Sequence, residues 1–499
     1  MSFLLGLDVG SSSIKASLLD AQIGKVLASA FSPETELKII AKNKGWAEQH
    51  PQTWWDNCIS AVRQILSRTK AYPSSIKAIG ISYQMHGLVV VDKNLEVLRP
   101  AIIWCDSRAV DIGRMAASHI GPQKCLKNLL NLPGNFTASK LKWVMENEPA
   151  IYSKIFKIML PGDYIAMKMT GEIKTTPSGL SEGILWDFKK QLPARIILDY
   201  YGINPDLIPP IVPTFSIQGL LTKQAAQQLG LQAGTPVSYR AGDQPNNALS
   251  LNVLYPGEIA ATAGTSGVVY GITEKNDYDK QSRVNTFVHV NHSAASPRYG
   301  VLLCINGTGI LNSWLKHNVT DSLSYEQMND LSSKAPVGSD GLVILPYGNG
   351  AERTLDNKDI GSSIHNLNFN IHTKSHLLRA AQEGIVFALN YGLQIMHQVG
   401  VEIKTVRAGN ANIFLSPLFA QAFAAVTGSV VELYNTDGSQ GAARGAGIGA
   451  GIYSNYNDAF IGLDRQKVIE PDKTLQPAYH QAYSTWLNVL KSQIAASAE

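Results

Sequence analysis

The sequence predicts an α/β protein made of two related halves. At 499 residues the chain is longer than a single hydrophobic core usually serves, so two or more domains are expected. Apolar runs of strand length alternate with segments of helical periodicity along most of the chain. A strand–turn–strand pattern at residues 3–20 returns at residues 256–272, and both turns consist of glycine and small hydroxyl residues. The repeat indicates a duplicated architecture with a ligand held between the halves.

The first of these two hairpins has a turn suited to phosphate. Gly10, Ser11 and Ser12 follow an apolar strand and precede an alternating one. Backbone N–H groups and hydroxyls in such a turn can bind phosphate oxygens. Asp8 would repel phosphate, so its place beside the turn suggests that it holds a cation, Mg²⁺ through water. The alternative is a plain surface hairpin with an aspartate near its turn.

The second hairpin repeats the phosphate-type turn without an acidic residue. Gly264, Thr265 and Ser266 would therefore bind phosphate without help from a metal. A nucleotide loop of the Walker type is absent, because the stretch at 438–451, rich in Gly and Ala, contains no Lys-Ser or Lys-Thr pair. That stretch instead predicts a closely packed helix from Gly441 onward.

A single carboxylate stands near the middle of the chain, between a predicted strand and a predicted helix. The strand-like run from Val237 ends at Gly242, Asp243 follows, and small residues suited to a helix come next. Open α/β sheets carry their reactive groups at the carboxyl ends of strands, which favours Asp243 as a functional residue. The alternative is an aspartate that only caps the helix.

Two further strands of the first half end in polar residues that suit a sugar. The strand at 76–82 leads into a loop that carries His86, and a second strand ends at Trp104 and Asp106. The C–H face of a sugar packs on an aromatic ring while its hydroxyls bond to polar groups. The alternatives are a structural histidine and an ion pair between Asp106 and Arg108.

In the second half, a predicted strand from Thr405 ends in a loop of small residues that includes Gly409 and Asn410. Small residues leave room for a flat ring such as adenine, and neighbouring amides can bond to the edge of that ring. A simple turn between strand and helix is the alternative.

Composition argues against several other classes of protein. The net charge of +4 comes with no basic run, so nucleic acid is not an expected partner. The four cysteines are scattered, which argues against a disulfide framework or a structural zinc site and fits a reducing compartment. We find neither a signal-type start nor an apolar stretch of bilayer length. The sequence therefore predicts a cytoplasmic protein without a membrane partner.

Taken together and in order, these motifs resemble the FGGY family of carbohydrate kinases over nearly the whole chain. The resemblance rests on the first phosphate motif Leu7-Asp8-Val9-Gly10-Ser11-Ser12, the second phosphate motif Gly264-Thr265-Ser266-Gly267 and the segment of the catalytic aspartate, Gly242-Asp243-Gln244. Three more segments are similar to the branch of the family that phosphorylates D-xylulose: Trp46–Pro51, Gln84–Gly87 and Phe136–Leu141. Glycerol kinases carry an Arg-Glu pair where this chain has Met85-His86.

The chain departs from the family pattern at three places. The family usually has three glycines before alanine where this chain has Ala408-Gly409-Asn410-Ala411. Many members of the D-xylulose branch have asparagine at the position of Gln244, and members commonly have Gly-Glu-Arg-Thr-Pro where this chain has Ala351–Leu355. These differences concern the nucleotide contacts and the identity of the sugar.

The resemblance implies two ribonuclease-H-like domains of the actin and hexokinase type, with an interdomain cleft. Residues 1–245 would form the sugar-binding domain and residues 246–499 the nucleotide-binding domain. Two such domains are expected to hinge and to close on their substrates, which expels water from the reaction. A homodimer is common in the family, but no segment here is identified as an interface.

The resemblance also implies roles for single residues. Asp243 would be the catalytic base, and Asp8 with Asp243 would hold Mg²⁺. The residues expected to bind the sugar are Met85, His86, Trp104, Asp106, Asp243 and Gln244. Those expected to bind ATP are Gly10, Ser11, Ser12, Gly264, Thr265, Ser266, Gly409 and Asn410.

The implied reaction is the transfer of phosphate from ATP to a primary hydroxyl of a ketopentose, D-xylulose giving D-xylulose 5-phosphate. Kinases for ribulose, fuculose, gluconate or glycerol remain alternatives within the family. The alternative outside enzymes is a non-catalytic, actin-like ATP-binding protein.

Overall fold

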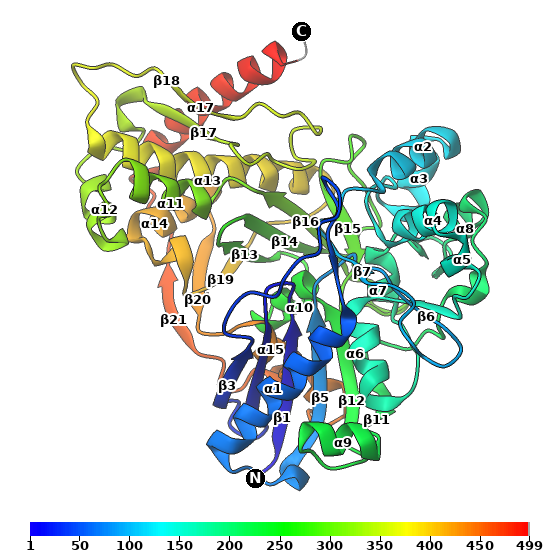
Figure 1. The fold of residues 1–499 in the computed structure, drawn as a ribbon. Coiled ribbons are helices and arrows are strands. Elements are labelled where there is room, and N and C mark those ends of the chain that lie inside the picture. The colour runs from blue at the N-terminus through cyan, green and yellow to red at the C-terminus, as the bar shows by residue number, and fades with distance from the viewer. Residues whose placement is uncertain (498–499) are drawn as a thin grey trace. The chain divides into compact units, whose positions relative to one another are not determined.

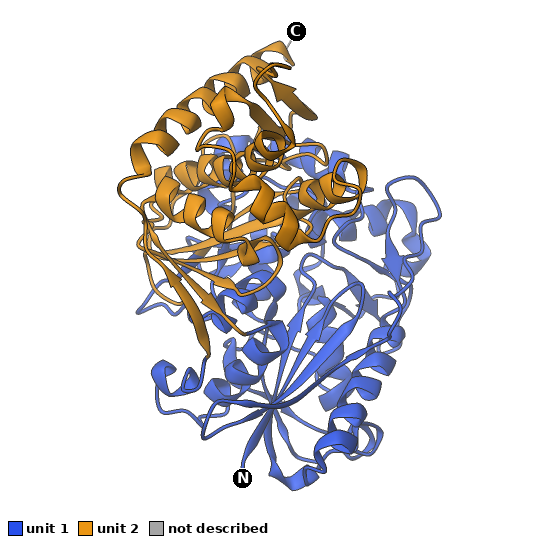
Figure 2. Ribbon diagram, turned by 90° about the vertical axis from the view of Figure 1, so that its left-hand side faces the viewer, with its two compact units in different colours: residues 1–252, 287–299, 436–463 blue, residues 253–286, 300–435, 464–499 orange. Residues whose placement is uncertain are grey.

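The computed structural model describes residues 1–497, and the chain divides into two compact units (Figure 1). Figure 2 shows the units in different colours. Unit 1 comprises residues 1–252, 287–299 and 436–463, and unit 2 comprises residues 253–286, 300–435 and the segment from residue 464. Each unit contains a mixed sheet with flanking helices, which confirms the predicted α/β class.

The sheet of unit 1 has six strands in the order β11-β12-β5-β1-β2-β3. Strand β1 pairs with β2 antiparallel and with β5 parallel, and β5 pairs with β12 parallel. The strands are β1 (Phe3–Val9), β2 (Ile14–Asp20), β3 (Val26–Ser32), β5 (Ile76–Tyr83), β11 (Phe215–Leu220) and β12 (Pro236–Gly242). The carboxyl ends of β1, β5 and β12 therefore lie at the same edge of the sheet.

Helices α1 (Pro51–Thr69) and α15 (Gly438–Gly449) pack against this sheet. Alternate residues of β1 belong to different cores, because side chains along a strand point to opposite faces. Leu5 lies in the core that contains Trp54 of α1, and Leu4 lies in the core that contains Ala443 of α15. The closely packed helix predicted around Gly441 is confirmed.

Smaller elements fill the rest of unit 1 between β3 and α10. The short strands are β4 (Glu48–Gln49), β6 (Val89–Val91), β7 (Ala101–Ile102), β8 (Lys157–Met159), β9 (Trp186–Asp187) and β10 (Leu192–Pro193). The helices are α2 (Val110–Ile120), α3 (Pro122–Leu129), α4 (Thr137–Asn147), α5 (Pro149–Tyr152), α6 (Pro161–Thr170), α7 (Pro177–Glu182), α8 (Arg195–Tyr201), α9 (Lys223–Leu229) and α10 (Asp243–Ser250), with α16 (Tyr456–Ala459) later in the chain. Single 3₁₀ turns lie at Pro73–Ser75 and Pro205–Leu207.

The sheet of unit 2 has seven strands in the order β15-β16-β14-β13-β19-β20-β21. These are β13 (Glu258–Ala263), β14 (Gly267–Thr273), β15 (Asn285–Val288), β16 (Tyr299–Ile305), β19 (Thr405–Gly409), β20 (Val430–Tyr434) and β21 (Arg465–Ile469), while β17 (Val343–Pro346) and β18 (Ser362–His365) form a separate pair. The helices are α11 (Gly309–Asn318), α12 (Tyr325–Ser332), α13 (Lys374–Gln398), α14 (Pro417–Thr427) and α17 (Gln476–Ala496), with 3₁₀ turns at Ser339–Gly341 and Asn412–Leu415.

Both predicted hairpins form, one in each unit. Asp8 lies opposite Lys15 in the pair β1–β2, and Ala263 lies opposite Gly267 in the pair β13–β14. The first strand of each hairpin also pairs parallel with a later strand, β5 in unit 1 and β19 in unit 2. This shared arrangement is the structural form of the repeat seen in the sequence. Among residues 1–497 we find no helix long and apolar enough to cross a bilayer.

Candidate active site

Asp243 lies where strand β12 ends and helix α10 begins. Gly242 is the cap residue of α10 and Asp243 is its first residue, and the Asp243 side chain is partly exposed. A Cβ atom on Gly242 would lie 2.5 Å from Cγ of Met85, so the glycine allows Met85 to pack against the chain immediately before Asp243. The structure thus brings Met85 and Asp243 together from segments that are distant in the sequence.

The environment of Asp243 suits a proton acceptor. Burial, followed by the charge of Asp8, raises the pKa of Asp243 to about 7, although hydrogen bonds from Gln244 work in the opposite direction. A general base is most effective when its pKa lies near the working pH. Gln244 is therefore a close neighbour of the Asp243 carboxylate as well as the next residue in the chain.

Asp8 lies on β1 and is surrounded by elements of unit 1. Its Oδ1 accepts a hydrogen bond of 2.8 Å from the Ser82 hydroxyl on β5. A Cβ atom on Gly438 would lie 2.5 Å from Oδ2 of Asp8, so only glycine at the start of α15 leaves room for this carboxylate. Burial raises the pKa of Asp8, and the charge of Asp437 raises it further despite the Ser82 hydrogen bond.

These carboxylates fit a cation that is held partly by other ligands. The charge of Asp437 raises the pKa of Asp8 and the charge of Asp8 raises the pKa of Asp243, and a cation would relieve this repulsion between like charges. Among the described residues, no three His, Cys, Asp or Glu side chains lie close enough together to hold a metal ion by themselves. Mg²⁺ commonly keeps several waters and binds one or two carboxylates together with substrate phosphates.

The turn between β1 and β2 is ordered by contacts within unit 1. The Gly10 N–H donates to the Ser13 carbonyl over 3.1 Å, and the Ser12 side chain is exposed. Ser11 Oγ accepts a hydrogen bond of 3.2 Å from Nε1 of Trp104, and Trp104 is 49% exposed. The structure therefore places the predicted sugar-side residue Trp104 against the predicted phosphate turn.

Asp106 is fully buried and its carboxylate is already bound to protein groups. It accepts a hydrogen bond of 2.6 Å from the Ala47 N–H and forms an ion pair with Arg108 at 2.7 Å. The ion pair considered from the sequence therefore exists, and Arg108 also contacts Glu48 at 2.7 Å. A contact between Asp106 and the sugar stays a prediction.

His86 lies in the loop between β5 and β6, as predicted. Its ring is only partly exposed and lies edge-on to Phe136, with 4.9 Å between the ring centres. A second ring, Phe287, lies 5.6 Å away. The buried Glu182 at the end of α7 contacts His86 through both its main chain and its side chain. Burial raises the pKa of Glu182 well above its usual value, opposed by a hydrogen bond from Tyr83 and increased by Asp243.

In unit 2 a cavity of about 520 Å³ opens beside the second phosphate-type turn. The turn is tied to helix α11, because the Gly264 and Thr265 carbonyls accept hydrogen bonds from the N–H groups of Gly309 and Ile310, at 2.9 and 3.2 Å. Polar lining residues come from three other segments: Asn312 and Ser313, Tyr325 and Asn329, and Asn412 and Ser416. The cavity thus combines a phosphate-type turn with amide side chains that can bond to a nucleobase.

Gly409 and Asn410, the residues predicted to contact adenine, do not line this cavity, although they are close in the sequence to residues that do. Gly409 ends β19, and the exposed Asn410 donates its N–H to the Tyr434 carbonyl over 2.8 Å. Asn412, in the 3₁₀ turn that follows, does line the cavity. Asn412 is not among the residues predicted to contact adenine, and its only sequence signal is its place in the same small-residue loop.

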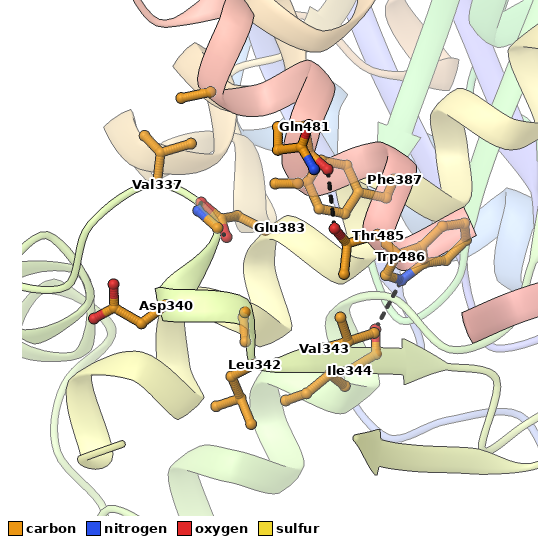
Figure 3. Close-up of a pocket in the computed structure, with 15 residues that line it drawn as sticks. Val337, Asp340, Leu342, Val343, Ile344, Glu383, Phe387, Gln481, Thr485 and Trp486 are labelled. Atoms are coloured by element: carbon orange, nitrogen blue, oxygen red, sulfur yellow. Dashed lines mark hydrogen bonds between the residues drawn. The ribbon is translucent and has the colours of Figure 1, made fainter. Parts of the chain in front are cut away.

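A second pocket of unit 2 lies between the 3₁₀ turn at Ser339–Gly341 and helices α13 and α17 (Figure 3). Its buried carboxylate, Glu383, accepts hydrogen bonds from Arg379 at 2.7 Å and from the Gly338 N–H at 3.2 Å. Trp486 Nε1 donates to the Ile344 carbonyl over 2.9 Å. This pocket shares no lining residue with the cavity at the phosphate-type turn.

Comparisons with known proteins identify the family. Residues 3–250 match the N-terminal domain, and residues 259–453 the C-terminal domain, of the FGGY family of carbohydrate kinases. A xylulose kinase of Staphylococcus epidermidis is 30% identical over 496 residues, which cover 98% of this chain and 96% of the relative. A xylulose kinase of Bacillus subtilis is 29% identical over 503 residues, which cover 97% of each chain.

Solved structures agree in fold. The crystal structure of xylulose kinase from Rhodospirillum rubrum superimposes with a TM-score of 0.90 at 24% identity, covering 100% of both chains. That of gluconate kinase from Lactobacillus acidophilus superimposes with a TM-score of 0.91 at 21% identity, covering 100% of this chain and 99% of the other. These two likenesses establish the fold alone.

The two mixed sheets with their flanking helices define a two-unit α/β protein with the actin-like architecture expected from the sequence. The chain belongs to the FGGY family of carbohydrate kinases. It is accordingly an ATP-dependent enzyme that phosphorylates a carbohydrate, and the alternative of a non-catalytic protein is set aside.

Proposed function

We propose that the enzyme phosphorylates D-xylulose at its primary hydroxyl and forms D-xylulose 5-phosphate. The observation that carries the proposal is Asp243, a partly exposed carboxylate with a pKa of about 7 at the end of β12, with Met85 packed against its neighbour Gly242. The relatives reported above, which match over nearly the full length, are named xylulose kinases and support the choice of sugar.

In this reaction the sugar hydroxyl loses its proton to Asp243 as its oxygen attacks the γ-phosphate of ATP. The new bond joins the sugar oxygen to phosphorus, and ADP leaves with the electron pair of the broken bond. Because the transition state of phosphoryl transfer is loose, Asp243 mainly positions the hydroxyl and accepts the proton late. Because the C5 oxygen closes the ring in the cyclic form of a 2-ketopentose, the hydroxyl that Asp243 would deprotonate is free only in the open-chain sugar.

Asp8 and Asp243 are the residues that would hold Mg²⁺ through water, since the charge of Asp8 raises the pKa of Asp243 and a cation beside them would relieve that repulsion. When bound, Mg²⁺ would neutralise part of the negative charge of the phosphates. The turn at Gly10–Ser12 and the turn at Gly264–Ser266 bind phosphate oxygens with N–H groups and hydroxyls.

The sugar contacts proposed are Met85, His86 and Gln244, with Trp104 and Asp106 as further predicted members. The adenine contacts proposed are Gly409 and Asn410, and we include Asn312 and Asn412 in the proposal because they line the cavity beside the second phosphate-type turn. The division into a sugar-binding domain at 1–245 and a nucleotide-binding domain at 246–499 is part of the same proposal. So is a cytoplasmic location, which fits the need for ATP and four free cysteines. A homodimer stays a prediction.

The test is a panel of sugars with MgATP, in which ADP release is measured by a coupled assay. The panel contains D-xylulose, ribulose, fuculose, gluconate and glycerol. We expect the largest kcat/KM for D-xylulose. A larger value for any other sugar would replace D-xylulose as the substrate, and ATP hydrolysis that no sugar accelerates would overturn the proposed reaction.

A further inference from the structure

His86 has a backbone conformation that needs support from its surroundings. Its φ is 62°, in the left-handed region that residues other than glycine rarely adopt. Such a conformation persists only where neighbouring groups hold it, and these cases gather at functional sites. In this structure, groups from helices α7 and α4 hold His86.

The first group is the side chain of Glu182, at the end of α7. Its carboxylate is almost fully buried, and Oε2 accepts a hydrogen bond of 3.2 Å from the His86 N–H. The other oxygen, Oε1, accepts a hydrogen bond of 2.6 Å from the Tyr83 hydroxyl. Both oxygens of Glu182 thus bind donors from the segment that carries His86.

The second group is the main chain of Glu182. Its carbonyl oxygen lies 2.8 Å from Nδ1 of His86. A carbonyl can only accept, so Nδ1 carries the proton in this contact. In the neutral imidazole, Nε2 is then an acceptor, and the contact of one nitrogen fixes the role of the other.

The third group holds the opposite end of the His86 peptide. The amino group of Lys140 on α4 is fully buried and donates to the His86 carbonyl over 2.8 Å and to the Ile103 carbonyl over 3.0 Å. The N–H and the C=O of His86 are therefore each bound by a buried side chain, Glu182 on one side and Lys140 on the other.

We propose that Glu182 is a positioning residue that holds His86 with Nδ1 protonated, so that Nε2 accepts a hydrogen bond from a hydroxyl of the sugar. The proposal rests on the assignment of His86 to the sugar site. Glu182 contacts His86 directly, and its effect on the sugar passes through His86.

Glutamine is a sharp probe of this arrangement. Glu182 offers two acceptor oxygens to two donors, Tyr83 and His86, whereas glutamine offers one oxygen and one NH₂ group. In E182Q the single amide oxygen can serve only one of them: either the His86 N–H faces the NH₂ group, or the Tyr83 hydroxyl must turn from donor to acceptor. The variant Y83F removes a single donor and leaves the Glu182–His86 contact in place, so its effect is expected in the same direction and smaller.

The experiment measures KM for the sugar and for ATP, using whichever sugar of the panel the wild-type enzyme phosphorylates best. We expect E182Q to raise the sugar KM roughly tenfold or more and the ATP KM less than about twofold. The matched control is E383Q, which alters a buried glutamate of unit 2 that binds Arg379 and Gly338 (Figure 3). We expect E383Q to leave the sugar KM unchanged.

A double-mutant cycle separates positioning from a general structural role. If Glu182 acts through His86, adding E182Q to H86A changes the sugar KM little, because residues of one network are not additive. Equal effects of E182Q in the wild-type and H86A backgrounds would overturn the proposal, as would an unchanged sugar KM in a folded E182L enzyme, which offers no acceptor to either donor. If neither variant folds, the tautomer of His86 in the wild-type enzyme, read by ¹⁵N NMR, decides the matter, because a proton on Nε2 in place of Nδ1 would overturn the proposal. Failure of the proposed reaction is seen separately, in the sugar panel of the wild-type enzyme.

Discussion

Asp243 combines a partly exposed carboxylate with a pKa of about 7, and the causes are burial and the nearby Asp8. These two features suit Asp243 to the role of proton acceptor proposed above. Since a positioned general base contributes about 10²–10⁴-fold to a rate, D243A should lower kcat by a factor in this range. Sugar affinity should change little, because the proton moves only in the transition state.

The measurement is kcat from the coupled assay together with the sugar Kd by calorimetry. The control is D187N, which alters a buried aspartate of unit 1 whose side chain accepts hydrogen bonds from the N–H groups of Lys189 and Lys190. A kcat of D243A within about tenfold of the wild type, equivalent to about 1.4 kcal/mol, would contradict the role of Asp243 as base.

Single candidate residues can be predicted from the sequence where the residues next to them in the chain form a recognisable local pattern. Asp243 follows a strand and a glycine, and the Gly-Ser turn follows Asp8, so local pattern identifies both. Glu182 and Lys140 are different, because their partner His86 lies 96 and 54 residues away. Such contacts depend on the packing of α7 and α4, which no local pattern describes.

At the scale of elements, helix α4 carries the side chain of Lys140 into the interior of unit 1. Burial lowers the pKa of Lys140 to about 7, although Asp106 raises it. Cys105 and Glu182 also raise this pKa, and Arg108 lowers it. An unfolded lysine has a pKa of about 10.4, so between about pH 7 and pH 10 the unfolded chain retains a proton that the folded chain has released.

The free energy of unfolding of unit 1 should therefore rise with pH across this window, by at most about 1.4 kcal/mol per pH unit from Lys140. Below about pH 7 both states hold the proton and the contribution to the slope vanishes. The variant K140M lacks the titrating group, so its pH slope should be smaller than that of the wild type. Urea unfolding at several values between pH 6.5 and pH 9.5 measures the difference, and equal slopes for the two proteins would refute it.

Elements with a clear period were predicted best. The hairpins β1–β2 and β13–β14 form as expected, since alternation of apolar and small residues marks their faces. Helix α13 runs from Lys374 to Gln398, and its apolar pattern is clearest between Leu377 and Leu393. Its terminal turns contain polar residues such as Lys374 and His397, which carry no periodic signal. The ends of an element are therefore harder to predict than its centre.

At the scale of the whole molecule, the compact units are not continuous in sequence. Residues 436–463, with helix α15, belong to unit 1 although they follow most of unit 2. The sequence did predict close packing for α15 from its glycines and alanines, but it did not indicate the partner strands β1 and β5. A functional boundary at 245/246 stays a prediction, because compactness does not test which unit binds which substrate.

Hydrogen exchange of the intact enzyme tests how the substrates divide between the two units. A ligand that binds only the folded state suppresses local opening, by up to about 100-fold in exchange rate at 100 times its Kd. We expect MgATP to slow exchange in the segments that line the cavity at the second phosphate-type turn, 263–265, 309–313 and 412–416. We expect the sugar to slow exchange at 84–87 and around Asp243.

The internal control is the segment 337–342, which lines the separate pocket of unit 2 (Figure 3). Its exchange should be the same with and without either ligand, because it shares no lining residue with the cavity at the phosphate-type turn. Protection of 337–342 by MgATP with no change at 309–313 would move the nucleotide site to that pocket. Protection by the sugar confined to unit 2 would contradict the proposed sugar site and, with it, the positioning role of Glu182.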